Sequence, residues 1–189
     1  MATNVLWSCL ALVLAFQAPS GNMLVNGDAA GGAGGWLTRG AATTERIHGV
    51  TCFTIRSAGS FRQEVSLPAD AIGKYVAVVA RGQADRVNAD GSITGLPYLY
   101  GTVKARDRTR FLAYWQGQQM LGRPRTAAEW VKMSGVFSVP YGAATVSIQL
   151  NQAERKDSPQ NGSAARFADV RMQLFPTEEA ARAFVAQYQ

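Results

Sequence analysis

The last third of the chain has a strong alternation of apolar and polar residues. Apolar side chains alternate over residues 131–139, again over 146–150, and once more over 167–174. Pro140-Tyr141-Gly142 separates the first two segments, and the polar stretch 151–165 separates the last two. Alternation with a period of two is typical of half-buried β-strands, and Pro-x-Gly is typical of a turn. The pattern predicts strand, tight turn, strand, solvent-exposed loop and a final strand.

The middle of the chain predicts further strands. Residues 50–55 and 60–67 alternate, whereas 74–81 is a continuous apolar run bounded by glycines, which is typical of a strand covered on both faces. Two aromatic-rich segments, 95–103 and 111–117, predict two more strands. The Gly-rich residues 31–40 predict a loop.

The period changes after residue 176. Thr177 is a good N-cap, and two glutamates follow it at the positive end of a helix dipole. Apolar side chains then share one face of a helix over 178–188. We expect a short amphipathic helix that packs on the sheets, with a docking tail for a partner as the alternative. The chain is therefore expected to be an all-β sandwich with a C-terminal α-helix.

Motifs at both ends of this region resemble one fold family. Residues 130–140 have the pattern W-x-x-x-x-G-x-F-x-V-P, and the chain closes with FADVRMQL at 167–174. The opening segment, NMLVNGD at 22–28 followed by Gly35-Trp36, is similar to the first segment of many carbohydrate-binding modules and of the F-box-associated domain. Over residues 22–175 the chain resembles galactose-binding-like jelly rolls. The resemblance implies a jelly-roll β-sandwich in which Trp36 and Trp130 lie in the core, whereas fold alone does not give function.

Residues 1–20 differ from the rest because they carry no charged side chain. Their apolar run, Val5 to Phe16, has the length of a signal-peptide core, and Ala18-Pro19-Ser20 suits a cleavage site. We expect a signal peptide at 1–20, a β-sandwich at 21–175 and the helix at 176–189. A membrane-anchoring or buried N-terminal segment is the alternative. No later apolar run predicts a transmembrane helix, so we expect an exported protein in the periplasm, the envelope or the medium.

The full chain contains two cysteines, Cys9 and Cys52. Removal of a signal peptide leaves Cys52 without an intramolecular partner. An exported protein without disulfides indicates a bacterial envelope. Cys52 lies in an alternating segment without a basic neighbour, so we interpret it as a buried, inert thiol, with a reactive nucleophile as the weaker alternative.

The formal net charge is +6, with basic residues gathered at 104–110 and 123–125. Nucleic-acid binding is one interpretation, and a solvated edge strand is the other. Export and the lack of a nucleic-acid motif argue against nucleic acid as a partner. Attraction to acidic polysaccharide or lipid headgroups stays open.

Few residues support catalysis. His48 is the only histidine and there is no P-loop motif, and a zinc site needs more Cys and His residues than the chain has. Glycoside hydrolysis needs only two carboxylates, but the acidic residues form no diagnostic pattern. We therefore expect that the protein is not an enzyme.

Sugar binding requires exposed aromatic rings and flanking polar groups. Several such residues lie on the two aromatic-rich strands, and Arg81 ends the continuous apolar run. Trp36 with residues 151–161 is an alternative site at the end of the sandwich, and a core position is the competing interpretation for the strand aromatics. The candidate ligand-binding residues are Tyr98, Tyr100, Tyr114, Trp115, Gln116 and Arg81.

The resemblance also implies a structural calcium ion between the N-terminal segment and the last strand. Asp169 matches one ligand position of the family, whereas Ala30 occupies the position of a glutamate. Asp28 is the candidate replacement. Carboxylate oxygens suit calcium, but one matching position is a small part of such a site, so we expect no cofactor and keep calcium as the alternative.

The sequence thus favours non-catalytic binding of carbohydrate or of a glycan-bearing surface. A structural or protein–protein interaction module of the envelope is the second hypothesis. A polysaccharide-acting hydrolase is the third.

Overall fold

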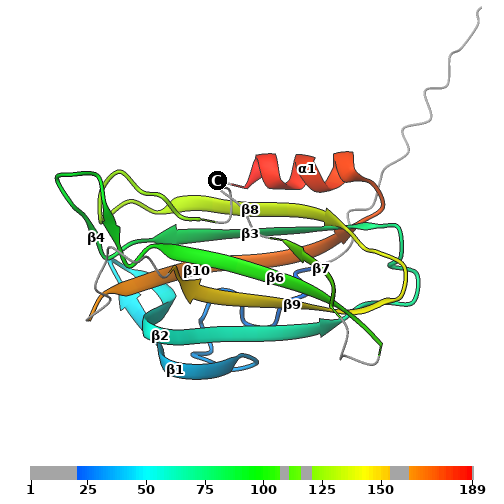
Figure 1. Cartoon of the computed structure of the whole chain (residues 1–189), viewed down its shortest axis with the longest axis horizontal. Helices are drawn as coiled ribbons and strands as arrows, with labels where there is room; N and C mark the ends of the chain where they lie inside the picture. The colour runs from blue at the N-terminus through cyan, green and yellow to red at the C-terminus, as the bar shows by residue number, and fades with distance from the viewer. Residues whose placement is uncertain (1–20, 107–110, 116–120, 154–161, 189) are drawn as a thin grey trace, which may run out of the picture.

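The computed structural model describes residues 21–106, 111–115, 121–153 and 162–188 (Figure 1). The predicted signal peptide and the centre of the predicted polar loop lie outside these residues. The elements are β1 (Leu37–Ile47), β2 (Val50–Ser66), β3 (Tyr75–Gln83), β4 (Arg86–Val87), β5 (Ile93–Thr94), β6 (Pro97–Ala105), β7 (Phe111–Trp115), β8 (Val131–Ser138), β9 (Ala143–Gln152), β10 (Ala164–Phe175) and α1 (Glu178–Gln187).

One antiparallel sheet, in the order β7-β6-β9-β2-β10-β3-β8, curls into two layers. The curl arises because β2 belongs to both layers. Residues 53–56 of β2 pair with β10, and residues 60–66 pair with β9 on the same edge. Layer A therefore contains β10, β3 and β8, and layer B contains β9, β6 and β7. β1 follows the other edge of β2, and in Figure 1 the ribbons of β6 and β9 pass in front of β10.

The bend in β2 explains why the sequence predicts two short strands where the structure has one long strand. Ser57 has a φ of 52°, and the pairing of β1 with β2 shifts register beside Gly40, whose φ is +60°. A Cβ atom at Gly59 would lie 2.7 Å from the carbonyl oxygen of Ala41. Local backbone conformations of this kind redirect a strand without ending it.

The prediction of a loop over residues 31–40 is wrong at its end, because β1 already begins at Leu37. β1 is mostly exposed and carries few apolar side chains, so its alternation is weak in the sequence. It is a strand because backbone hydrogen bonding to β2 holds it, which is a tertiary effect.

The core lies between the two layers. β2 contributes to both halves of it, with Phe53 and Ile55 beside layer A and Phe61 beside layer B, all fully buried. Trp36 packs against Phe53 with ring centroids 4.9 Å apart, and its Nε1 donates to the carbonyl of Val25 at 3.1 Å. These contacts confirm the core assignment of Trp36. The core assignment of Trp130 is wrong, because Trp130 is half-buried beneath the guanidinium of Arg81.

The opening segment is attached to the last strand. The amide of Met23 donates to the carbonyl of Met172, and the amide of Val170 donates to the carbonyl of Gly27, each at 2.8 Å. A Cβ at Gly27 would lie 2.0 Å from the oxygen of Val170, so only glycine fits there. The opening motif at 22–28 and the closing motif at 167–174 therefore lie side by side.

The helix α1 covers the outer face of layer A. The hydroxyl of Thr177 accepts from the amide of Ala180 at 3.2 Å, which confirms the predicted N-cap. Phe184 lies 5.3 Å from Phe175 between ring centroids, and Ala181 packs on Ala77. The helix docks on the sandwich as predicted. Within the described part of the chain, no helix has the length and apolar character needed to cross a membrane.

Candidate functional site

The outer face of layer B is polar and aromatic. Strand alternation turns Leu99 and Val103 of β6 into the core, and leaves Tyr98, Tyr100 and Lys104 on the outer face. The pairing registers arrange this face in rows that cross the strands. One row consists of Tyr98, Asn151, Ser60 and Arg39, and the next consists of Tyr100, Gln149, Arg62 and Leu37.

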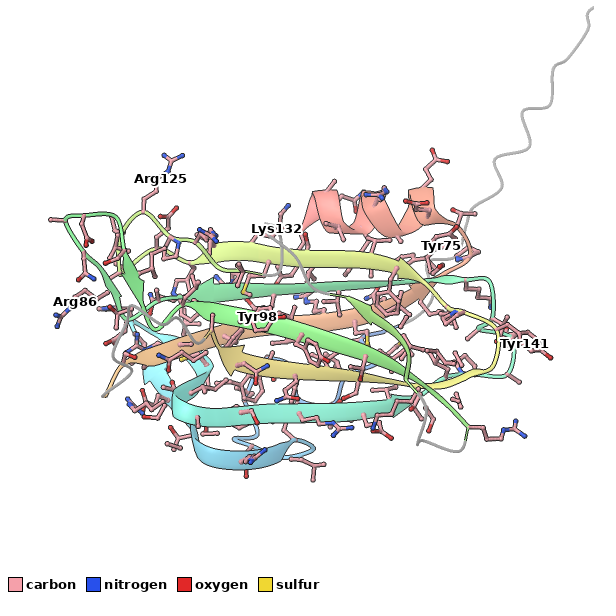
Figure 2. The ribbon with its side chains drawn as sticks, in the orientation of Figure 1. Tyr75, Arg86, Tyr98, Arg125, Lys132 and Tyr141 are labelled. Atoms are coloured by element: carbon pink, nitrogen blue, oxygen red, sulfur yellow. The ribbon has the colours of Figure 1, made fainter. Side chains whose placement is uncertain are left out.

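Two tyrosines of β6 form the aromatic part of this face. The ring centroids of Tyr98 and Tyr100 are 6.3 Å apart, with an angle of 45° between the rings. Both side chains are half-buried, and burial raises the pKa of the Tyr98 hydroxyl, so the ring is neutral at physiological pH. Figure 2 shows Tyr98 on the β6 ribbon, and its side chain is partly exposed.

A depression of about 300 Å³ lies beside the tyrosines, between β1, the bend of β2 and the end of β9. Gln149 and Asn151 line it, and the amide of Gln149 donates to the Oδ1 of Asn151 at 2.9 Å. Tyr98 lies opposite Asn151 and Tyr100 opposite Gln149 across the β6–β9 pair, so each tyrosine is the cross-strand neighbour of a residue that lines the depression. The full lining is Arg39, Ser57, Ala58, Gly59, Ser60, Gln149, Asn151 and Gln152.

The other end of the face carries a charged cluster. Glu64 accepts from Arg62 at 2.7 Å and from Lys104 at 3.3 Å. The Nε of Arg62 also donates to the hydroxyl of Ser147 at 2.9 Å. Among the described outward-pointing residues of β6, β9 and residues 60–66 of β2, Glu64 carries the carboxylate, and it forms ion pairs with two cations.

The structure brings some predicted ligand residues together and separates others. Tyr98 and Tyr100 are neighbours, and the backbones of Tyr114 and Trp115 lie on β7 opposite Thr102 and Gly101. Gln116 lies outside the described residues.

Arg81 does not belong to this face. It lies on β3 in layer A, forms an ion pair with Asp169, and has its guanidinium carbon 5.7 Å from the centre of the Trp130 ring. Its predicted grouping with the tyrosines does not occur, because alternation along β3 turns it to the outer face of the opposite layer.

Sequence reasoning missed Arg39, Ser60 and Gln149, and it included Asn151 only as the first residue of the alternative site 151–161. The signal for Gln149 and Asn151 was present, since polar residues alternate with Val146, Ile148 and Leu150 along β9. Their relation to the tyrosines depends on strand pairing, which the alternation of a single strand does not contain.

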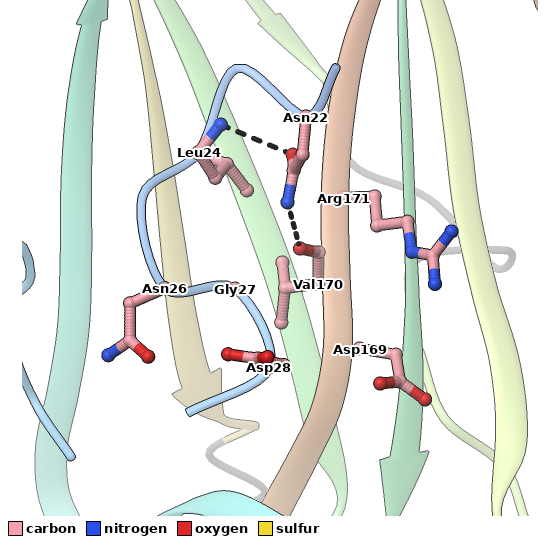
Figure 3. Close-up of a pocket in the computed structure, with 8 residues that line it drawn as sticks. All are labelled: Asn22, Leu24, Asn26, Gly27, Asp28, Asp169, Val170 and Arg171. Atoms are coloured by element: carbon pink, nitrogen blue, oxygen red, sulfur yellow. Dashed lines mark hydrogen bonds between the residues drawn. The ribbon is translucent and has the colours of Figure 1, made fainter. Parts of the chain in front are cut away.

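The two candidate calcium ligands line one pocket of about 260 Å³ (Figure 3). The Oδ1 of Asp28 accepts from the amide of Ala30 at 3.1 Å, whereas the carboxylate of Asp169 pairs with Arg81. Figure 3 shows the two carboxylates on opposite sides of the β10 ribbon. No group of three or more Cys, His, Asp or Glu side chains is gathered for a metal among the described residues. These donors do not fit calcium, since a cation at Asp169 would compete with a guanidinium.

The two remaining candidate reactive residues, His48 and Cys52, lie in a turn and in the buried interior. His48 is exposed in the turn between β1 and β2, where His48 and Gly49 both have positive φ, as in a tight hairpin turn. Cys52 is fully buried, and burial raises the pKa of its thiol. This confirms the interpretation of Cys52 as a buried thiol, because a reactive cysteine needs an exposed thiolate.

Comparison with known proteins places the fold. No model of a known protein family matches the chain, and no curated protein matches its sequence. Among solved structures, the enzymatically active domain of tailspike protein 4 from bacteriophage CBA120 matches with a TM-score of 0.58 and 16% identity, over 82% of this chain and 21% of that chain.

Two domain structures from one bacterial protein also match. The tandem CBM22-1-CBM22-2 domain of Paenibacillus barcinonensis Xyn10C has a TM-score of 0.57 and 15% identity, over 85% of this chain and 48% of that chain. The CBM22-1 xylan-binding domain of the same protein has a TM-score of 0.50 and 15% identity, over 76% of this chain and 87% of that chain.

The present chain thus spans about a fifth of the tailspike chain and about half of the tandem domain. At these identities the matches show the fold. The protein shares the jelly-roll β-sandwich fold of these CBM22 domains, which confirms the fold class that the end motifs predicted.

Proposed function

We propose that the protein binds a polysaccharide or a glycan-bearing surface, without catalysis, through the outer face of layer B. The observation that carries this proposal is the position of the Tyr98–Tyr100 pair beside the amide-lined depression. The fold supports it, because a domain described as xylan-binding shares the same architecture.

The arrangement suits sugar recognition physically. The C–H face of a pyranose packs on an aromatic ring, and its hydroxyls need donors and acceptors. The side chains of Gln149 and Asn151 supply both, and β9 holds them within one strand spacing of the rings. A rigid sheet surface of this kind needs little reorganisation on binding, which favours affinity.

The charges of the same face favour binding over hydrolysis. Glycosidases of the common type use two carboxyl groups roughly 5 to 10 Å apart. Among the described outward-facing residues of this face, the carboxylate is Glu64, and Arg62 and Lys104 hold it in ion pairs. A carboxylate held by two cations in this way suits neither a general acid nor a free nucleophile.

The test is binding of the purified chain to a panel of soluble polysaccharides, measured by affinity electrophoresis and calorimetry. We expect Tyr98→Ala and Tyr100→Ala each to raise Kd about tenfold, equivalent to about 1.4 kcal/mol. Tyr141→Ala is the matched control, because Tyr141 is 89% exposed in the turn between β8 and β9, away from the depression. Equal binding by all three variants would place the site elsewhere, and binding to no polymer would remove the proposal.

A further inference from the structure

Arg39 is the one charged side chain among the residues that line the depression. It is exposed, and it lies on β1 opposite Ser60, immediately before the register shift at Gly40. The remaining lining groups are hydroxyls, amides and backbone. The guanidinium of Arg39 therefore gives the edge of the depression a positive charge.

Four arginines on the described strands form ion pairs with carboxylates, and Arg39 has no carboxylate partner among the described residues. Arg56 pairs with Glu45 at 2.6 Å, Arg62 with Glu64 at 2.7 Å and Arg166 with Asp85 at 3.2 Å. Arg171, which lines the other pocket, lies over the ring of Tyr188 at 5.6 Å. Within the described part of the chain, Arg39 thus combines a pocket position with a guanidinium that no carboxylate or ring engages.

From this combination we infer that the depression binds the carboxylate of a uronic acid residue, so that the preferred ligand is an acidic polysaccharide. The inference rests on the proposed glycan-binding function and names the class of glycan. Arginine suits this role because its planar fork of N–H donors matches both oxygens of a carboxylate. The hydroxyl of Ser60 and the amide of Asn151, in the same row, can bond the neighbouring sugar hydroxyls.

The register gives the ligand a direction. Tyr98, Asn151, Ser60 and Arg39 form one row across β6, β9, β2 and β1, so Tyr98 and Arg39 are three strand spacings apart, or ~14 Å. This separation between the two backbones exceeds the width of one sugar ring. A short oligosaccharide that crosses the strands can stack on Tyr98 while it places a carboxylate at Arg39.

The net charge of +6 by itself attracts any polyanion, so the test must separate a carboxylate site from general attraction. The probes are glucuronoxylan, polygalacturonate, alginate and hyaluronan, each compared with the same polymer after chemical reduction of its carboxyl groups to alcohols. Binding is measured in 0.5 M NaCl, where exposed charges are screened beyond ~4 to 5 Å and a paired carboxylate in the depression is less affected.

We expect the native chain to bind at least one acidic polymer tenfold or more tightly than its reduced form. Arg39→Gln should remove this preference and keep the affinity for the reduced polymer, and Arg39→Lys should keep part of the preference. Arg46→Gln is the matched control, because Arg46 is exposed on the same strand, outside the depression, and its loss changes the net charge equally.

Equal binding of acidic and reduced polymers, or a preference that survives Arg39→Gln, would overturn the inference and leave the glycan-binding function in place. A failure to bind every polymer of either kind would instead reject that function. Equal losses in Arg39→Gln and Arg46→Gln would assign the preference to net charge and overturn the carboxylate site.

Discussion

At the scale of single residues, position in the fold decides which candidate side chains are free to react or to bind a ligand. Cys52 is fully buried, and its Sγ donates to the carbonyl of Glu45 at 3.6 Å. Arg81 has its guanidinium engaged by Asp169 and Trp130, whereas Arg39 has a depression in front of it. The residue types alone do not distinguish these arginines, because their difference lies in partners supplied by other strands.

The state of Cys52 can be measured by thiol labelling. In a Cys9→Ser variant, we expect a disulfide reagent at pH 8 to label the native protein at least a hundredfold more slowly than the unfolded protein, because burial excludes the reagent and raises the thiol pKa. The Cys9→Ser/Cys52→Ser variant gives the background. Labelling of the native protein at the unfolded rate would contradict the buried position.

At the scale of elements, the C-terminal helix is held at both ends. Its N-terminus has the Thr177 cap, and beyond its last turn the hydroxyl of Tyr188 donates to the carbonyl of Asp169. Arg171 lies over the Tyr188 ring, and the Nζ of Lys132 donates to the carbonyl of Val185 at 3.1 Å. The helix is therefore part of the folded unit, and it covers the face of layer A opposite the proposed binding face.

Tyr188 gives this attachment a pH dependence. Burial, followed by the charge of Asp169, raises the pKa of Tyr188 to about 12. Its pKa in the unfolded chain is about 10. Below pH 10 the hydroxyl is protonated in both states, whereas between about 10 and 12 only the unfolded chain loses the proton, so the stabilisation falls as the pH rises through this window.

We expect Tyr188→Phe to lower the free energy of unfolding by about 1 kcal/mol at pH 8, through loss of the hydrogen bond. The difference in the free energy of unfolding between the native protein and Tyr188→Phe should be smaller at pH 11 than at pH 8, as measured by urea unfolding at both pH values. Tyr141→Phe is the control, because Tyr141 is exposed and should leave both values unchanged. A difference in unfolding free energy that is the same at both pH values would contradict the raised pKa of Tyr188.

At the scale of the whole molecule, β2 joins the two layers through one core. Phe53 and Ile55 from its first half and Phe61 from its second half belong to the same cluster as Met172 of β10 and Ile148 of β9. The rings of Phe53 and Phe61 are 4.9 Å apart across the bend. Neither layer has a core of its own, so the sandwich should unfold as one unit.

This shared core predicts coincident transitions. Denaturant unfolding followed by tryptophan fluorescence and by far-UV circular dichroism should have one midpoint. Phe61→Ala should lower that midpoint for both probes together, with a loss of about 3 to 5 kcal/mol, because it removes a fully buried ring. Separate midpoints for the two probes would show that the layers unfold independently.

Much of the fold follows from local pattern. Alternation located most strands, and Thr177 with the apolar face after it located α1, because burial on one side imposes a period of two on a strand and of 3.6 on a helix. Local pattern did not predict β1, whose alternation is weak because it is exposed, or show that β2 is one continuous bent strand. Backbone pairing between strands maintains both features.

The sequence was enough to locate most of the strands and the helix, to predict that Cys52 and Trp36 are buried, and to assign two tyrosines to one strand. Which side chains lie close together depended on the tertiary structure. Strand register placed Tyr98, Asn151, Ser60 and Arg39 in one row, and alternation placed Arg81 on the opposite face. The physical reason is that register arises from hydrogen bonds between strands far apart in the chain, so the composition of a binding face is a property of paired strands.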